Sequence, residues 1–515
     1  MAFEGTRHWP PSRFFDDIPF ALHSLACLRA ASAPKGLARA VLSDTTINTL
    51  RRKSPDLSAA ESLSRWQRIA PFAVTSVVAA LVVAWPRAAS NAMAITLAVP
   101  FILVVMLRVA ALACMRRSAR SAPKRQARNA RSRRRGAVPP PLPTYSVLAA
   151  LYREAAVAPG LVRSLAALDY PRTKLEIIFL LEEDDVETRA ALSTAISLPH
   201  MRVVVVPKGN PKTKPRALTY GLQAAQGDLI AVYDAEDVVE RSQLRLAAAA
   251  FAAGDERLAC VQARLGIYNP NETWISRQFT IEYAALFEAI LPMLERLGFP
   301  MPLSGTSNHF RRSCLVEAGA WDPYNLTEDA DLGMRFARLG YRTAMIESTT
   351  WEEAPTTWKV WLGQRTRWIK GWMQTYLVHM RHPWRVTREV GAWGFFGMQL
   401  TFGAMMLSAL VHPWFYVALA VGAARGEPVL SGEGAVWTAA KVVLISGYVT
   451  GIALPAAAVA RRRGGALALS ALWHPIYWLA ISLAAYRAIL DLMLRPYYWE
   501  KTPHRGAVTH RQRRS

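Results

Sequence analysis

Three acidic residues follow a short apolar run near the middle of the chain. Residues Leu229–Tyr233 are apolar and partly β-branched, and Asp234, Glu236 and Asp237 come directly after them. Such a run is typical of a strand buried on both faces of a parallel sheet, and ligands bind outside the carboxyl ends of those strands. A hard divalent cation relieves the repulsion between neighbouring carboxylates and also binds substrate phosphates. The pattern predicts a metal and phosphate site, and an acidic loop without a ligand is the alternative.

Acids also follow two other apolar runs. Tyr152 and Glu154 come after Tyr145–Leu151, and Glu183–Asp185 come after Leu175–Leu181. If these runs are parallel strands, their carboxyl ends lie at one edge of the sheet. Carboxylates there could accept hydrogen bonds from the ribose and base of a nucleotide. Ordinary polar loop residues are the alternative.

A basic segment, Lys212–Arg216, stands ahead of a helical pattern and includes Lys214. Cations and free backbone N–H groups at the start of a helix suit a phosphate group. A solvated basic loop explains the same residues without a ligand.

A further acidic cluster, Asn325–Asp331, leads into the expected helix Leu332–Leu339. Thr327 could cap this helix, and acids in a first turn are favoured by stability alone. The carboxylate of Asp329 could also act as a general base towards a hydroxyl group.

Gln364, Arg367 and Trp368 have the spacing i, i+3, i+4, so they share one face of a helix. Trp358, Trp361 and Trp372 lie on the same expected helix. Tryptophan is enriched at membrane–water boundaries, which favours a helix on the membrane surface. Membrane anchoring does not explain Gln364 and Arg367. Hydrogen-bond donors that face a sugar or a diphosphate would explain both residues.

Strand and helix patterns alternate between residues 143 and 356. The expected strands are Tyr145–Leu151, Leu175–Leu181, Met201–Val206, Leu229–Tyr233 and Leu258–Leu265, and the expected helices are Pro159–Ala167, Val186–Ala195, Arg216–Ala225 and Ser242–Ala252. This alternation predicts a mostly parallel sheet, so the fold class is α/β.

Long apolar runs flank this α/β domain. They are Ile69–Trp85 and Met93–Cys114 before it, and Trp393–Val421, Val436–Ala460 and Ala466–Leu490 after it. Each is long enough to cross about 30 Å of hydrocarbon as a helix, and buried core helices are the alternative. We expect an arm at 1–65, two spans in 66–115, a basic and proline-rich linker at 116–142, the domain at 143–356, a surface-helix region at 357–390, three or four spans in 391–492 and a basic tail at 493–515.

The net charge of +24 is concentrated beside a span, where ten of the twenty residues in Arg116–Arg135 are basic. Basic residues next to a span mark its cytoplasmic side and attract anionic lipids. We therefore expect a multi-pass protein of the plasma (inner) membrane with a cytoplasmic domain. Nucleic-acid binding is the alternative. An even number of C-terminal spans brings the tail back to the cytoplasm but puts Arg461–Arg463 outside, against the charge rule.

In this order, the motifs resemble those of the membrane-integrated inverting glycosyltransferases of family 2, which include cellulose, curdlan and hyaluronan synthases. The resemblance covers residues 143–380. Asp234-Ala235-Glu236 matches the family's D-x-D, Thr327-Glu328-Asp329 its T-E-D, and Gln364-x-x-Arg367-Trp368 its Q-x-x-R-W. The resemblance implies a GT-A fold between transmembrane helices, a nucleotide-sugar donor (most often a UDP-sugar) and Mg²⁺ or Mn²⁺.

The resemblance also implies a role for each matching residue. Asp329 would deprotonate the acceptor hydroxyl, and Asp234 and Glu236 would bind the metal. The implied substrate-binding residues are Tyr152, Glu154, Glu183, Lys214, Thr327, Glu328, Gln364, Arg367 and Trp368. The sequence departs from the family at Glu236, which is followed by Asp237, and at Glu182–Asp185, where many relatives have two aspartates and a glycine.

We therefore expect transfer of a sugar, UDP-glucose being one candidate donor, to a growing β-linked polysaccharide at the membrane. The first rival is the addition of one sugar to a lipid carrier or glycolipid, and product length separates the two. The second rival is a transport subunit that binds nucleotide without transfer. The expected partners are the nucleotide-sugar, a polysaccharide or lipid-linked acceptor and membrane lipids, with no nucleic acid.

Overall fold

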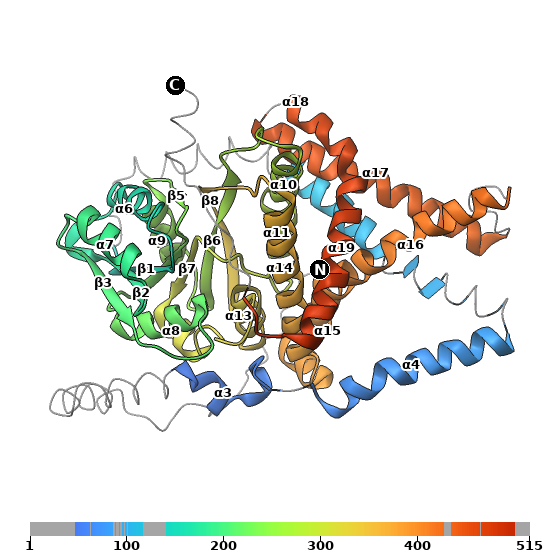
Figure 1. Cartoon of the computed structure of the whole chain (residues 1–515), viewed down its shortest axis with the longest axis horizontal. Helices are drawn as coiled ribbons and strands as arrows, with labels where there is room; N and C mark the ends of the chain where they lie inside the picture. Colours follow the sequence, from blue (N-terminus) through green and yellow to red (C-terminus); the bar gives the residue numbers. More distant parts are fainter. Residues whose placement is uncertain are drawn as a thin grey trace, which may run out of the picture. The chain divides into compact units, whose positions relative to one another are not determined.

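The computed structural model in Figure 1 describes residues 47–61, 63–85, 88, 92, 95, 96, 98, 99, 101–116, 141–426, 434–463 and 465–499. Most of the expected arm, the basic block after Arg116, part of the second expected span and the end of the basic tail lie outside the described residues.

The α/β domain is built on an eight-stranded mixed sheet of order β3-β2-β1-β4-β7-β6-β8-β5. Strands β1 to β4 pair in parallel, β6 pairs in parallel with β8, and β7 runs antiparallel between β4 and β6. Their bounds are β1 Tyr145–Leu151, β2 Leu175–Glu182, β3 Met201–Val206, β4 Leu229–Tyr233, β5 Val238–Val239, β6 Leu258–Ile267, β7 Asn308–Arg311 and β8 Arg342–Glu352. The predicted α/β class is confirmed, in the form of a GT-A-like, mostly parallel sheet.

Helices cover both faces of the sheet (Figure 1). Alternate residues of β2 belong to two different cores: Ile177 and Phe179 pack on one face, and Ile178 and Leu180 on the other. A strand buried on both faces reads as a continuous apolar run, which is the pattern seen in the sequence. The helices of the domain are α6 Ala158–Ala166, α7 Val186–Ala195, α8 Lys214–Ala224, α9 Gln243–Ala253, α10 Trp274–Ala285, α11 Leu291–Leu297, α12 Arg312–Glu317 and α13 Glu328–Arg338.

Within the described residues, four helical segments are long and apolar enough to cross a membrane. They are α4 Arg65–Ala84, the segment Pro383–Ala424, the segment Trp437–Arg463 and the segment Gly465–Leu494. The second contains α15 Pro383–Met398 and α16 Met405–Ala424, the third lies in α17 Ala435–Arg463, and the fourth contains α19 His474–Leu494. Pro413 lies inside α16, so the helix continues through His412-Pro413.

Two of the three arginines that end α17 contact the α/β domain. Arg462 Nη1 donates to Leu265 O of β6 at 3.1 Å and pairs with Glu288 at 3.3 Å. Arg463 donates to Ile267 O, also in β6. The end of α17 therefore lies against the domain, and an arrangement that puts these arginines on the side of the membrane opposite the domain does not agree with these contacts.

Helix α19 explains why the observed arrangement differs from the expected one, because it runs beside α14 (Trp358–His379). Trp361 Nε1 donates to Tyr477 OH at 3.0 Å near the start of α19, and Gln374 Nε2 donates to Pro496 O at 3.0 Å just after its end. Both ends of α19 therefore lie on the same helix of the domain. The same contact changes the interpretation of the α14 tryptophans, since Trp361 is fully buried in this packing and does not face lipid.

Candidate active site

A cavity of about 1000 Å³ begins at the carboxyl ends of the parallel strands. It brings together residues from β1, β4, α8, α13 and α14 that are far apart in sequence. Of the residues to which the family resemblance gives a role, all except Glu183 line it: Tyr152, Glu154, Lys214, Asp234, Glu236, Thr327, Glu328, Asp329, Gln364, Arg367 and Trp368.

Glu183 is exposed and does not line the cavity described here; its carboxylate faces the backbone N–H of Lys208 at 3.4 Å. Glu182 lines the cavity in its place and pairs with Arg216 at 3.3 Å. Strand β2 continues one residue beyond its predicted end, and a shift of one residue in a strand reverses the side to which a side chain points.

Lys214 is the cation nearest to the acids after β4. Its Nζ contacts Asp234 Oδ1 and donates to Gly305 O at 2.6 Å. Burial alone would lower the pKa of Lys214, but the charges of Asp234, Glu328 and Asp329 outweigh it and raise the pKa. The site therefore holds a fixed positive charge among its carboxylates.

The three acids after β4 differ in position. Asp237 is buried, and its Oδ2 accepts from Asp234 N at 2.8 Å and from Thr306 Oγ1, so this residue holds the turn. Asp234 and Glu236 line the cavity. No group of three or more His, Cys, Asp or Glu side chains is arranged as a metal site among the residues that the structure describes. Two carboxylates completed by donor phosphates and water remain a suitable site for Mg²⁺.

Asp329 lies in the first turn of α13, across a small space from Asp234. A Cβ added at Gly305 would lie 3.7 Å from Asp329 Oδ2, 3.7 Å from Lys214 Nζ and 3.8 Å from Asp234 Oδ2. Burial raises the pKa of Asp329 to about 6 and that of Glu328 to about 8. Thr327 occupies the N-cap position of α13, but its side chain makes no cap hydrogen bond. A carboxylate with a raised pKa beside a cavity is typical of a general base.

Helix α14 contributes polar atoms without protein partners. Gln364 Oε1 and Arg367 Nε are buried and have no hydrogen-bond partner among the described residues. Burial lowers the pKa of Arg367, although nearby acids, Glu328 first among them, oppose that effect. Because buried polar groups are normally satisfied, these two atoms indicate substrate contacts. The Arg365 guanidinium lies over Trp368, 4.8 Å from the centre of the Trp368 ring.

Two residues of the cavity carried no signal in the sequence. Trp499 follows α19 and stacks on Arg367, whose guanidinium lies 4.4 Å from the ring centre. Lys370 of α14 holds this segment by donating to Tyr498 O at 3.0 Å. Glu352, at the end of β8, also lines the cavity. Neither Trp499 nor Glu352 stands in a recognisable motif, and only the packing of α19 and β8 brings these two residues to the site.

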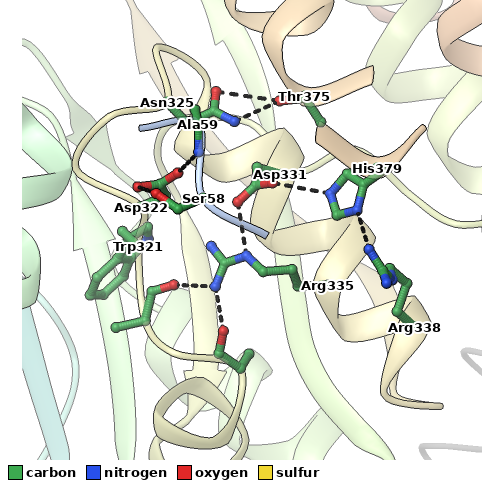
Figure 2. A network of polar contacts seen from close by, with 12 residues as sticks. Ser58, Ala59, Trp321, Asp322, Asn325, Asp331, Arg335, Arg338, Thr375 and His379 are labelled. Carbon is green, nitrogen blue, oxygen red and sulfur yellow. Dashed lines mark hydrogen bonds and ion pairs between the residues drawn. The ribbon is translucent and has the colours of Figure 1, made fainter. Parts of the chain in front are cut away.

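Figure 2 shows how a buried network joins α13 to α14. Asp331 accepts from Arg335 Nε at 2.8 Å and faces His379 Nε2 at 3.0 Å, and His379 Nδ1 faces Arg338 Nη1 at 3.1 Å. Since arginine can only donate, Nδ1 accepts and Nε2 carries the hydrogen. Burial lowers the pKa of His379, in agreement with a neutral ring. The network holds the helix that carries Asp329 against the helix that carries Gln364 and Arg367.

The loop before α13 is held from both sides (Figure 2). Asp322 accepts from Ser58 Oγ at 3.2 Å and from Ala59 N at 2.6 Å. Asn325 Nδ2 donates to Thr375 Oγ1 of α14 at 3.0 Å. The described part of the expected N-terminal arm therefore packs on the α/β domain.

The cavity continues between the apolar helices. Arg108 Nη1 donates to Gly447 O of α17 at 3.0 Å, and its guanidinium lies 5.7 Å from the Trp478 ring centre. His412 packs against Tyr448 and Trp478, with ring centres 5.8 and 5.5 Å apart. Gly447 precedes Arg461 by fourteen residues of helix, or roughly 21 Å. A polar and aromatic cluster thus lines the cavity far from the domain.

Comparison with known proteins agrees with this geometry. Residues 140–371 match the family described as "Glycosyltransferase like family 2". The "Probable glycosyltransferase YdaM" of Bacillus subtilis is 28% identical over 292 residues, 55% of this chain and 69% of the relative. The "Beta-monoglucosyldiacylglycerol synthase" of Synechocystis is 27% identical over 256 residues, 49% of this chain and 52% of the relative.

Two further proteins are similar over part of the chain. The "Poly-beta-1,6-N-acetyl-D-glucosamine synthase" of Staphylococcus aureus is 27% identical over 229 residues, 44% of this chain and 53% of the relative. The solved mannosyltransferase PcManGT of Pyrobaculum calidifontis has 18% identity and a TM-score of 0.46, covering 75% of this chain and 99% of that one. The chain spans about half the length of several curated relatives that it matches. The match to the glycosyltransferase family 2 model therefore covers residues 140–371, which is less than half of this chain.

Proposed function

We propose that the chain transfers a sugar from a nucleotide-sugar, UDP-glucose or a related donor, to a growing β-linked polysaccharide with inversion at the anomeric carbon. The observation that carries the proposal is the continuity of the cavity. It joins the carboxylates around Asp329 to the polar and aromatic cluster around Arg108.

The donor side of the cavity has the charges that a sugar diphosphate needs. Asp234 and Glu236 would bind Mg²⁺ or Mn²⁺, and the cation would neutralise the diphosphate as it leaves. Lys214 and Arg367 supply fixed positive charge from two other elements, which would stabilise the same leaving group. Tyr152, Glu154 and Glu182 at the ends of β1 and β2 would contact the nucleoside.

In this proposal Asp329 acts as the base. Its carboxylate would take the proton of the acceptor hydroxyl while that oxygen forms the new bond to the anomeric carbon. The bond from this carbon to the diphosphate oxygen breaks on the opposite face, so the configuration inverts. Gln364 and Trp368 would hold the acceptor sugar, and Thr327 and Glu328 would shape its site.

The lining between the apolar helices favours a polysaccharide. Polar and ionisable side chains are costly inside a bilayer and mark the path of a polar substrate. Arg108, His412 and Tyr448 could hydrogen-bond sugar hydroxyls, and Trp478 offers a ring face to a sugar. A polymer extended at Asp329 would move along this lining. One relative is by name a polysaccharide synthase, which agrees with this proposal.

A second candidate is the addition of one sugar to a lipid. Apolar side chains, among them Phe101, Val104 and Phe415, line the same part of the cavity. They would suit acyl chains, and another relative is by name a glycolipid synthase. Either acceptor is reached from a membrane, and we place the catalytic domain on the cytoplasmic side of the plasma (inner) membrane.

The test is transfer of labelled sugar by the purified full chain in lipid vesicles. A panel of UDP-sugars would be offered with Mg²⁺, with Mn²⁺ or with a chelator, and the product would be sized. We expect a cation-dependent polymer from one donor. A lipid carrying one sugar would establish the second candidate, and nucleotide binding without transfer under any condition would favour a transport subunit.

A further inference from the structure

A smaller cavity of about 630 Å³ lies where two apolar segments begin. Trp66, in the first turn of α4, forms one wall, and Trp384, in the first turn of α15, forms another. Arg381, Arg385 and Arg388 complete most of the lining. If α4 and α15 cross the membrane, the mouth of this cavity lies at the level of the lipid headgroups.

The cavity has an excess of positive charge. Arg385 pairs with Asp56 at 2.8 Å and with Glu389 at 2.8 Å. Neither Arg381 nor Arg388 has an ion pair with a carboxylate among the residues that the structure describes. Arg381 is 8% exposed, and its Nε lacks a hydrogen-bond partner within the described chain. Its other nitrogens donate to backbone carbonyls, for example Glu61 O at 2.7 Å, and not to a carboxylate within the described chain.

The start of α15 adds to the positive potential of this cavity. His382 at the N-cap position makes no side-chain cap bond, so the first-turn N–H groups of α15, whose backbone is kinked at Gly391, have no side-chain cap. Helix N-termini bind phosphate through such groups and through the helix dipole. Arg381 and Arg388 are independent of the helix end and point to the same kind of ligand.

The tryptophans indicate where the anion comes from. Trp384 is 79% exposed and Trp66 is 45% exposed, and the Nε1 of Trp66 donates to Arg381 O at 3.1 Å. Exposed tryptophan at the start of an apolar helix is typical of the membrane interface. A phosphate ion from solution needs no apolar wall, whereas a lipid brings glycerol and acyl carbons next to its phosphate.

We propose that this cavity binds the phosphate group of an anionic membrane lipid. Arg388, Arg381 and the start of α15 hold the phosphate, and Trp66 and Trp384 pack against the carbons next to it. The site would fix α4 to α15 at the membrane surface. The proposal depends on these two segments crossing the membrane and not on the transfer reaction.

The test is lipid retention by the purified full chain, measured by native mass spectrometry from bilayers containing equal phosphatidylglycerol and phosphatidylcholine. Wild type should retain phosphatidylglycerol in preference. Arg388→Gln should weaken that retention about fivefold, as expected for one basic residue at a charged membrane surface. Trp384→Leu should weaken retention of the lipid without a change in headgroup preference. Arg425→Gln, at the far end of the same apolar segment, should retain lipid as wild type does.

Three results would overturn the proposal: equal loss in Arg388→Gln and Arg425→Gln, equal retention of the two lipids by wild type, or displacement of the bound lipid by inorganic phosphate. Sugar transfer by Arg388→Gln in detergent should equal that of wild type. This control separates a failure of the lipid site from a failure of the proposed transfer.

Discussion

Asp329 is the residue on which the proposed chemistry depends most. Replacing it with Asn removes the base and keeps the shape, so transfer should fall by about 10²–10⁴-fold. Donor binding, measured by calorimetry, should stay close to wild type, because no donor contact is lost. Glu183→Gln is the matched control, since Glu183 is an exposed acid outside the described cavity, and it should leave both quantities unchanged. If Asp329→Asn abolished binding and transfer together, Asp329 would be structural.

The pH dependence of transfer should report the same carboxylate. Burial raises the pKa of Asp329 to about 6, so the base is ionised above that pH and protonated below it. The rate should therefore fall as the pH falls through about 6. A bound cation would move this acidic limb of the pH profile to a lower pH. Glu328→Gln should keep the limb, because burial raises the pKa of Glu328 to about 8 and it is already protonated there. A rate that rises as the pH falls would exclude Asp329 as the base.

The metal assignment rests on Asp234. Asp234→Ala should remove the cation-dependent part of donor affinity and leave the cation-independent part. The comparison is a donor titration with Mg²⁺ and with a chelator. Asp184→Ala, an exposed acid after β2 that pairs with Lys212, is the control. Donor affinity that still depends on Mg²⁺ in Asp234→Ala would place the cation elsewhere.

The motif residues of the site could be predicted because each stands at the end of an apolar run or on one face of a helix. The single-residue shift between Glu183 and Glu182 could not be predicted, since the end of a strand depends on its neighbours. Trp499 and Glu352 reach the site only through α19 and β8. No local pattern carries that information.

At the scale of elements, α13 and α14 must keep a fixed relation for Asp329 to face Arg367. His379→Phe would leave the buried Asp331 with one donor fewer, at a cost of about 1–3 kcal/mol of stability. We expect a lower midpoint of thermal unfolding and a larger loss in kcat than in donor affinity. His379→Gln keeps an N–H donor and should recover part of both. His200→Phe, in the turn before β3, should have neither effect.

The strands differ in how well their sequences predicted them. Strands β1 to β4 are mostly apolar, and the predicted bounds of three of them agree with the structure. Strands β7 and β8 contain Asn308, His309, Glu347 and Glu352, and β5 has two residues. Their pairing comes from long-range contacts, which outweigh local preference.

At the scale of the whole molecule, the contacts of Arg462 and Arg463 with β6 remove the conflict between span count and charge. The segment Pro383–Ala424 leads away from the domain, and α17 leads back to it. In intact cells, a membrane-impermeant thiol reagent should label Ala424→Cys and leave Gly465→Cys unlabelled until the membrane is opened. Labelling of both from outside would contradict this arrangement.

In the proposed function, the cavity carries the acceptor from Asp329 to the space between the membrane helices. A Cβ at Gly451 would lie 2.7 Å from the Trp478 ring and 2.8 Å from Arg108 Nη1, so Gly451→Leu should block this cavity. Gly422→Leu is the control, since a Cβ there meets nothing within 4 Å.

The measurement is the length distribution of the polysaccharide made by each variant in vesicles from the same labelled donor. We expect that Gly451→Leu still hydrolyses or transfers the donor sugar but makes only short products, while Gly422→Leu makes the wild-type length. Polymer of wild-type length from Gly451→Leu would show that the acceptor does not pass along this cavity.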